Sequence, residues 1–262
     1  MSESPQEKKI ATRLFVEEPL TQGAKIGLDH ARAHFLRSVL RLGQDARLAV
    51  FNGRDGEWLA RIEGLGKGWA SLEVLEQRRP QTPEPDLWLA FAPIKRGRID
   101  FLAEKAAEIG CSRLLPVITR FTDVSRVNTE RLAANAREAA EQCERLTVPE
   151  VAEPIKFANL AETWPAERRL ILCAEFGPAR PIAEALSEIG ETPGPLGVMT
   201  GPEGGFARSE LDALVELPFV TPVNLGPRIL RADTAALAAL ALAQALCGDW
   251  RDRPDIRVAP AS

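Results

Sequence analysis

The first part of the chain alternates apolar and polar positions with the two-residue period that indicates β-strands. The alternation is clear in residues 57–62 and 69–74, and the glycine-rich run 64–68 between them predicts a hairpin turn. One stretch, about 28–42, instead places its apolar residues at helical spacing. Several short strands with a single helix predict a small β-barrel over residues 13–77.

A proline-rich segment, residues 78–86, follows and is predicted to be a linker. After it, buried strands alternate with amphipathic helices. The predicted strands are residues 87–94, 113–119, 169–175, 195–200 and 219–226, and the predicted helices are 98–109, 129–146, 181–189, 209–217 and 232–246. Such alternation predicts an α/β domain with a mostly parallel sheet covered on both faces. We place it at residues 87–250, with tails at 1–12 and 251–262.

Composition and charge exclude several classes of protein. The 262 residues are 45% hydrophobic, enough for a core, and the net charge of −4 argues against nucleic-acid binding over the whole surface. The four cysteines form no CxxC pair and the only histidines are His30 and His34, so zinc-finger sites are not expected. No GxSxG motif is present. With no membrane-spanning run and no secretory signal, we expect a cytoplasmic protein with free thiols.

Two loops are candidates for chemistry because ligands bind beyond the carboxyl ends of strands in an open α/β sheet. Residues 200–206 carry three glycines, which let the backbone approach a ligand. They match neither a Walker A motif nor GxGxxG, and Glu203 would repel a pyrophosphate. Residues 225–234 place apolar side chains between Arg228 and Arg231, which suits an adenine ring. Taken alone, the first loop could equally be an elaborate turn, and the arginines a solvated helix start.

A local basic cluster lies in the N-terminal part of the chain. Residues 30–47 contain four arginines, two histidines and a single acid, Asp45. The pattern is typical either of an RNA-binding patch or of a solvated helix face.

These motifs resemble a known family. GPEGGF at 201–206, followed by LGPRILRADTA at 225–235, resembles the SPOUT class of RNA methyltransferases. RLFVEE at 13–18, HFLRSVLRLGQD at 34–45 and FNGRDGEWLARI at 51–62 resemble the PUA-like N-terminal domain of one branch, and residues 99–121 and 138–151 resemble its linking half. The likeness runs from 13 to 249 and is to the ribosomal small-subunit methyltransferase E family, which methylates N3 of a uridine in 16S rRNA. Asp233-Thr234 stands where that family usually has Glu-Thr.

The resemblance implies a fold and a cofactor. The fold is a C-terminal SPOUT domain tied in a trefoil knot, preceded by a PUA-like domain, and acting as a homodimer through the C-terminal domain. The cofactor is S-adenosyl-L-methionine, and no metal is needed. The implied cofactor-binding residues are Thr200, Gly201, Pro202, Glu203, Gly204, Gly205, Leu225, Gly226, Ile229, Leu230 and Thr234.

The resemblance also suggests catalytic and RNA-binding candidates. Uridine N3 must lose a proton, and arginine can stabilise the negative charge that develops on the uracil oxygens. Arg231 and Arg145 are the candidates for this role. Glu141 is a candidate base, with a solvated helix carboxylate as the alternative. The candidate contacts to 16S rRNA are Arg32, Arg37, Arg41, Arg47, Lys95, Arg96 and Arg98. There are two competing hypotheses. One is a SPOUT enzyme that acts on another RNA atom, such as a ribose 2′-hydroxyl, and the other is a non-catalytic ribosome-assembly factor.

Overall fold

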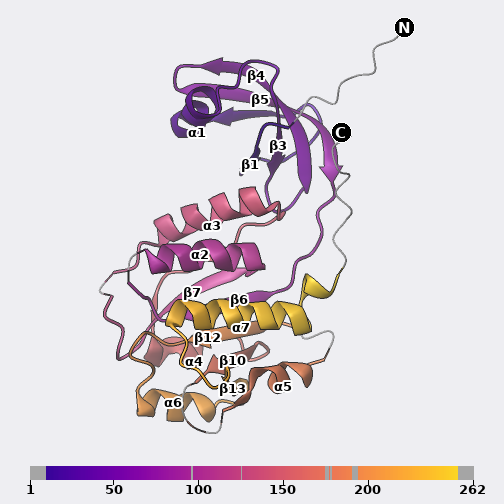
Figure 1. The fold of residues 1–262 in the computed structure, drawn as a ribbon. Coiled ribbons are helices and arrows are strands. Elements are labelled where there is room, and N and C mark those ends of the chain that lie inside the picture. The colour runs from indigo at the N-terminus through magenta and orange to yellow at the C-terminus, as the bar shows by residue number, and fades with distance from the viewer. Residues whose placement is uncertain are drawn as a thin grey trace. The chain divides into compact units, whose positions relative to one another are not determined.

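The computed structural model describes residues 10–95, 97–124, 126–174, 177, 179–190 and 194–252, so most of both predicted tails lies outside the described residues. Contacts divide the chain into two compact units (Figure 1). One unit is Met1–Pro83 with Ala140–Val148, and the other is Glu84–Ala139 with Pro149–Ser262. Among the described helices, none is long and apolar enough to cross a membrane.

The first unit is built on one sheet. Its elements are β1 (Arg13–Phe15), β2 (Lys25–Leu28), α1 (His30–His34), a π-helical turn η1 (Phe35–Val39), β3 (Arg47–Phe51), β4 (Glu57–Gly66) and β5 (Trp69–Arg79). The strand order is β1-β3-β4-β5-β2, with β1 parallel to β3 and every other pair antiparallel. The described pairings end at β1 and β2, so the predicted barrel takes the form of an open five-stranded sheet.

Local sequence explains the limits of these elements. Asp29 caps α1, because its Oδ1 accepts a hydrogen bond from the Arg32 amide at 2.8 Å. The predicted helix over 28–42 is therefore shorter at both ends, and it changes to π-helix at Phe35. The second strand of the β4–β5 hairpin continues to Arg79, so the first two residues of the predicted linker belong to β5.

An ion-pair cluster ties segment 140–148 to this unit. Glu57, only 2% exposed, pairs with Arg13 at 2.6 Å, with Arg79 at 2.7 Å and with Arg78 at 2.8 Å. The Arg13 guanidinium also donates to the carbonyl oxygens of Ala140 and Arg145, both at 2.8 Å. Burial raises the pKa of the Glu57 carboxyl, but the hydrogen bonds and charges of Arg79 and Arg13 outweigh it and hold that pKa below its usual value.

The second unit is an α/β layer structure. Its strands are β6 (Leu87–Phe91), β7 (Arg113–Ile118), β8 (Glu150–Val151), β9 (Ile155–Lys156), β10 (Arg169–Cys173), β11 (Arg180–Pro181), β12 (Leu196–Thr200) and β13 (Val220–Asn224). Its helices are α2 (Arg98–Ile109), α3 (Thr129–Cys143), α4 (Leu160–Thr163), α5 (Ile182–Ser187), α6 (Arg208–Val215) and α7 (Ala232–Cys247), with short 3-10 turns η2 (Phe157–Asn159) and η3 (Asp249–Arg251). All pairings are parallel, in the order β11-β13-β10-β12-β6-β7-β8, with β9 beside β7. The predicted mostly parallel sheet is thus confirmed.

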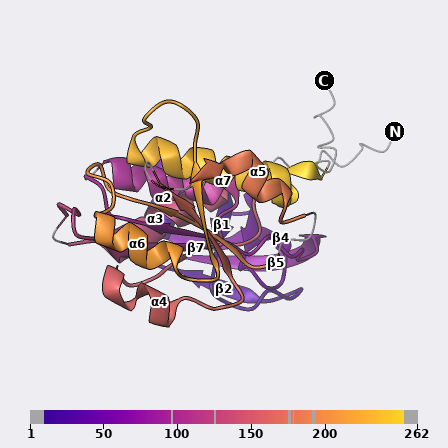
Figure 2. The same ribbon diagram turned by 90° about the horizontal axis from the view of Figure 1, so that it is seen from below.

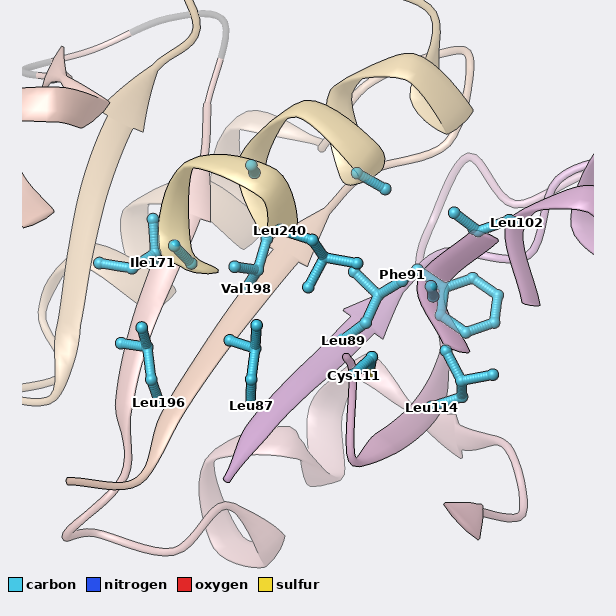
Figure 3. Packing of buried hydrophobic residues seen from close by; sticks show 14 of the residues in the cluster. Leu87, Leu89, Phe91, Leu102, Cys111, Leu114, Ile171, Leu196, Val198 and Leu240 are labelled. Atoms are coloured by element: carbon cyan, nitrogen blue, oxygen red, sulfur yellow. The ribbon is translucent and has the colours of Figure 1, made fainter. Parts of the chain in front are cut away.

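Helices cover both faces of this sheet, and each face has its own core. Figure 2 shows α2, α5 and α7 on one face and α4 and α6 on the other. On the first face, Leu240 of α7 lies over Val198 of β12 and Leu89 of β6 (Figure 3). On the second face, Leu214 of α6 and Trp164 are buried in a separate cluster. Burial on both faces explains why these strands read as continuous apolar runs rather than as alternating ones.

Candidate functional site

A cavity opens at the carboxyl ends of three neighbouring parallel strands, β10, β12 and β13. Its volume is about 640 Å³, within the range of small-molecule sites. The lining residues come from the ends of these strands, from the loops that follow them and from the chain after β6. They are Lys95, Arg98, Cys173, Ala174, Thr200, Gly201, Pro202, Glu203, Gly204, Gly205, Phe206, Leu211, Val223, Asn224, Leu225, Gly226, Pro227, Arg228, Ile229, Leu230, Arg231, Ala232 and Ala235.

The loop after β12 forms one wall of the cavity and is held by local hydrogen bonds. Its first residue, Thr200, is buried and its carbonyl accepts the Ala92 amide at 3.0 Å. The Gly205 amide closes a tight turn onto the Pro202 carbonyl at 2.9 Å, with a φ of 69° at Gly205 that favours glycine. The turn from Pro202 to Gly205 is therefore closed by the loop's own backbone.

A buried carboxylate fixes the end of the same loop. Glu210 accepts the Ala207 amide through Oε2 at 2.9 Å and the Arg120 amide through Oε1 at 2.8 Å. Helix α6 begins at Arg208, one residue before the predicted start, and Glu210 is the residue that reaches back to the first amide.

The loop after β13 forms the opposite wall. Asn224 anchors it, since its Oδ1 accepts the Gly226 amide at 3.2 Å and its Nδ2 donates to the Ala179 carbonyl at 3.0 Å. Gly226 has a φ of 95°, and no atom lies within 4 Å of where a β-carbon would be. Ile229 in this loop lines the cavity and is 87% exposed, so its apolar side chain is open to solvent. Such a wall offers apolar contact to a ligand.

Cations dominate the charged lining. Lys95, Arg98, Arg228 and Arg231 contribute positive charge, and Glu203 is the single acid among the lining residues. Arg98 is partly neutralised because its Nη1 lies 3.4 Å from Asp233 Oδ2. The site therefore suits a partner that becomes negatively charged.

The thiol in the lining is not a candidate nucleophile. Burial raises the pKa of the Cys173 thiol to about 12. At neutral pH the group is protonated, whereas a nucleophilic cysteine acts as its thiolate. Among the described residues, no group of histidine, cysteine, aspartate and glutamate side chains could hold a metal ion.

Most residues proposed from sequence for the cofactor meet at this cavity. Ten of the eleven line it, and Thr234 does not. Arg231 also lines it. Sequence reasoning missed the end of β10, where Cys173 and Ala174 lie between the two loops. The rule that ligands bind at carboxyl ends of strands could have found them.

The other two catalytic candidates lie in segment 140–148 of the first unit. Glu141 Oε1 accepts the Phe15 amide at 2.9 Å. Arg145 Nη2 donates to Thr147 Oγ1 at 2.9 Å. Both side chains therefore have local structural partners, and their catalytic roles remain predictions.

The residues proposed for RNA contact separate into two groups. Arg32, Arg37, Arg41 and Arg47 lie in the first unit, on α1, on η1, after it and at the start of β3, and none forms an ion pair with another described residue. Lys95 and Arg98 instead line the cavity of the second unit. Arg96 lies outside the described residues.

Comparisons with known proteins agree with this architecture. A family described as RNA methyltransferase domain matches residues 81–244, and a family described as RNA methyltransferase PUA domain matches residues 28–75. Ribosomal RNA small subunit methyltransferase E of Rickettsia conorii is 35% identical, over 87% of this chain and 93% of the relative. The protein of the same name from Synechocystis is 33% identical, over 90% of this chain and 78% of the relative.

Two solved structures of methyltransferases are similar to this chain over most of its length. The crystal structure of a ribosomal RNA small subunit methyltransferase E from Neisseria gonorrhoeae bound to S-adenosyl methionine superposes with a TM-score of 0.81 and 29% identity, covering 91% of this chain and 99% of that one. A Legionella pneumophila methyltransferase in complex with the same cofactor gives a TM-score of 0.79 and 26% identity, covering 92% and 99%. The chain belongs to the ribosomal RNA small subunit methyltransferase E family of RNA methyltransferases.

Proposed function

We propose that this chain transfers a methyl group from S-adenosyl-L-methionine to N3 of a uridine in 16S rRNA of the small ribosomal subunit. The observation that carries the proposal is the cavity at the carboxyl ends of β10, β12 and β13, where both glycine-bearing loops meet. The names of the relatives and the cofactor bound to the Neisseria gonorrhoeae structure support the substrate class and the methyl donor.

The lining of the cavity fits this cofactor. Leu225, Ile229 and Leu230 offer apolar surface that an adenine ring would cover. The loop from Thr200 to Gly205 would hold the ribose and the methionine end, where Glu203 favours a cation and disfavours a polyphosphate. When bound, the sulfonium of the cofactor supplies an electrophilic methyl group.

The chain's own residues then have two tasks. The two loops align the cofactor and the base, and positioning of this kind carries a large part of the rate in a one-step transfer. The cations of the lining stabilise negative charge on the uracil oxygens as N3 loses its proton, and Arg231 is our candidate for this contact. Arg145 is our second candidate for this contact. Glu141 is our candidate for the base that accepts the N3 proton.

Nucleoside analysis tests the reaction. Purified protein is incubated with labelled S-adenosyl-L-methionine and small ribosomal subunits from a strain that lacks this gene, and the RNA is digested and separated by chromatography with mass detection. We expect label in 3-methyluridine. Label in a 2′-O-methylated nucleoside would overturn the N3 assignment, and absence of label despite cofactor binding would favour a ribosome-assembly factor without catalytic activity.

We also propose that the second unit carries the trefoil knot of its class. The support is the path of the last segment. The chain leaves β13, which β10 separates from β12, and α7 then packs on α2, α5 and β12. A knot allows the loops after β12 and β13 to share one cavity.

A homodimer through the second unit, acting in the cytoplasm, completes the proposed function. Phe101 of α2 is 45% exposed and Trp250, just after α7, is 53% exposed, so apolar surface is available on this unit. Light scattering after size exclusion tests the dimer: twice the chain mass is expected, and the mass of a single chain would contradict it.

A further inference from the structure

The glycine-rich hairpin turn of the first unit supports one aromatic side chain in an unusual position. Trp69 opens β5 and is 54% exposed. It pairs in register with Gly66 of β4. A β-carbon on Gly66 would lie 2.1 Å from Trp69 Nε1, and one on Gly64 would lie 2.9 Å from Trp69 Cη2. The indole therefore lies across the backbone of β4, with one ring face on the two glycines and the other face toward solvent.

The surface beside the ring is nearly free of side chains. Ser71, two residues along β5 on the same face, pairs with Gly27 of β2 on one side and Gly64 of β4 on the other. On the opposite face, Ala70 and Leu72 are buried in the core, which fixes the register of the exposed face. This surface carries a single aromatic ring, and we call it the tryptophan platform. It consists of Gly27, Gly64, Gly66, Trp69 and Ser71.

Charges around the platform differ at its two ends. Beyond Ser71, both cations are neutralised by carboxylates. Lys25 pairs with Glu63 and Glu73, and Arg61 pairs with Glu73 and Asp45. Beside the ring, the exposed Lys67 follows Gly66, and His30 of α1 approaches so closely that a β-carbon on Gly68 would lie 2.8 Å from its Cδ2. Helix α1, which carries Arg32, packs against β5 on the opposite face, because its Ala33 is buried in one cluster with Ala70 and Leu72. Lys67 is thus the exposed cation at the turn beside the ring.

We propose that the tryptophan platform stacks an unpaired base of the RNA substrate, while Lys67 contacts a flanking phosphate. A ring held flat by glycines loses little conformational freedom on binding, and stacking on aromatic side chains is the common way in which proteins hold unpaired bases. The matched RNA methyltransferase PUA family spans residues 28–75 and includes the whole of this surface except Gly27. The inference rests on the proposed function in taking RNA as the partner.

Binding of a short fluorescein-labelled single-stranded RNA of mixed sequence, followed by fluorescence anisotropy, tests the inference. Trp69→Ala should weaken binding about 10-fold, while Trp69→Phe, which keeps an aromatic face, should retain most of the affinity. Trp69→Phe is the matched control, because it keeps an aromatic ring over the same two glycines, Gly64 and Gly66. On the same RNA with abasic residues, wild type and Trp69→Ala should bind alike, because no base is left to stack. An unchanged circular-dichroism spectrum and an unchanged urea-unfolding midpoint show that Trp69→Ala is folded, and unchanged S-adenosyl-L-methionine affinity shows that the cavity of the second unit is intact.

Three results would overturn the inference. Trp69→Ala could bind the RNA as tightly as wild type, or lose the same affinity on abasic RNA, which would assign Trp69 a role without stacking. A loss seen with small ribosomal subunits but not with free RNA would make the partner a ribosomal protein. A failure of the proposed function can be told apart from these results. In that case the wild-type protein itself does not methylate small ribosomal subunits.

Discussion

Each unit of this protein contains a glycine-rich segment, and the two segments work in different ways. In the second unit, Gly205 and Gly226 take positive φ angles in loops at the carboxyl ends of parallel strands, where a cavity of about 640 Å³ opens. In the first unit, Gly64 and Gly66 lie within an antiparallel strand and matter because they lack a β-carbon beneath Trp69. Sheet type makes the difference, since only parallel strands bring several loop starts to one edge.

The largest expected effect is a loss of stability caused by a substitution in the first unit. Glu57→Gln leaves Arg13, Arg78 and Arg79 without their shared carboxylate and should lower the free energy of unfolding by about 3 kcal/mol at pH 7. Urea denaturation measures it. Glu73→Gln, which removes a more exposed pair with Arg61, is the control and should change stability much less.

The same variant tests how the stability of the protein depends on pH. The pKa of Glu57 is lower in the folded than in the unfolded chain, so its contribution is present above the unfolded value of about 4.3 and is lost as the pH falls through the folded value. The unfolding free energies of wild type and Glu57→Gln should therefore converge in acid. A difference that stays constant with pH would show that the charge of Glu57 is not its source.

A smaller effect is expected on RNA affinity, and it distinguishes the glycines of the first unit from those of the cavity. Gly66→Ala places a methyl group against the Trp69 indole and should lower RNA affinity several-fold by lifting the ring, with cofactor affinity unchanged. Gly43→Ala adds the same methyl group in the first unit where no atom lies within 4 Å. Equal RNA affinity of the two variants in fluorescence anisotropy would contradict the platform.

The smallest effect concerns the cavity thiol. With a pKa of about 12, only about one part in ten thousand of Cys173 is thiolate at pH 8. Iodoacetamide should leave Cys173 unmodified in the folded protein and alkylate it after unfolding in urea, as peptide mass spectrometry measures. Rapid alkylation of the folded protein would mean that the cavity activates this thiol, and would reopen covalent chemistry.

Sequence patterns predicted the long elements because burial imposes a clear period on them. Helix α2 begins and ends where expected, at Arg98 and Ile109, with Gly110 at a φ of 103° as its stop. The stretch between α3 and β10 could not be predicted, because β8, β9 and α4 are too short to show a period. Trp164 there is buried by a distant partner: a β-carbon on Gly197 would lie 2.5 Å from its ring.

The candidate site, too, could be predicted only in part from local sequence patterns. Both loops of the cavity could be located because their glycines and apolar residues follow predicted strands, but the adjacency of β10 to β12 and β13 depends on strand order. Strand order is set by long-range packing that no local pattern records. The partners of Glu141 and Arg13 are long-range for the same reason.

The central claim is that the methyl donor binds between the loops after β12 and β13. Isothermal calorimetry with S-adenosyl-L-methionine on a matched pair of variants tests it most directly. Gly226 and Gly190 have φ angles of 95° and 85° with open space around them, so alanine strains both backbones similarly, but only Gly226 lines the cavity. We predict that wild type and Gly190→Ala bind alike and that Gly226→Ala binds about 10-fold more weakly. Equal affinity of the two variants would contradict the site.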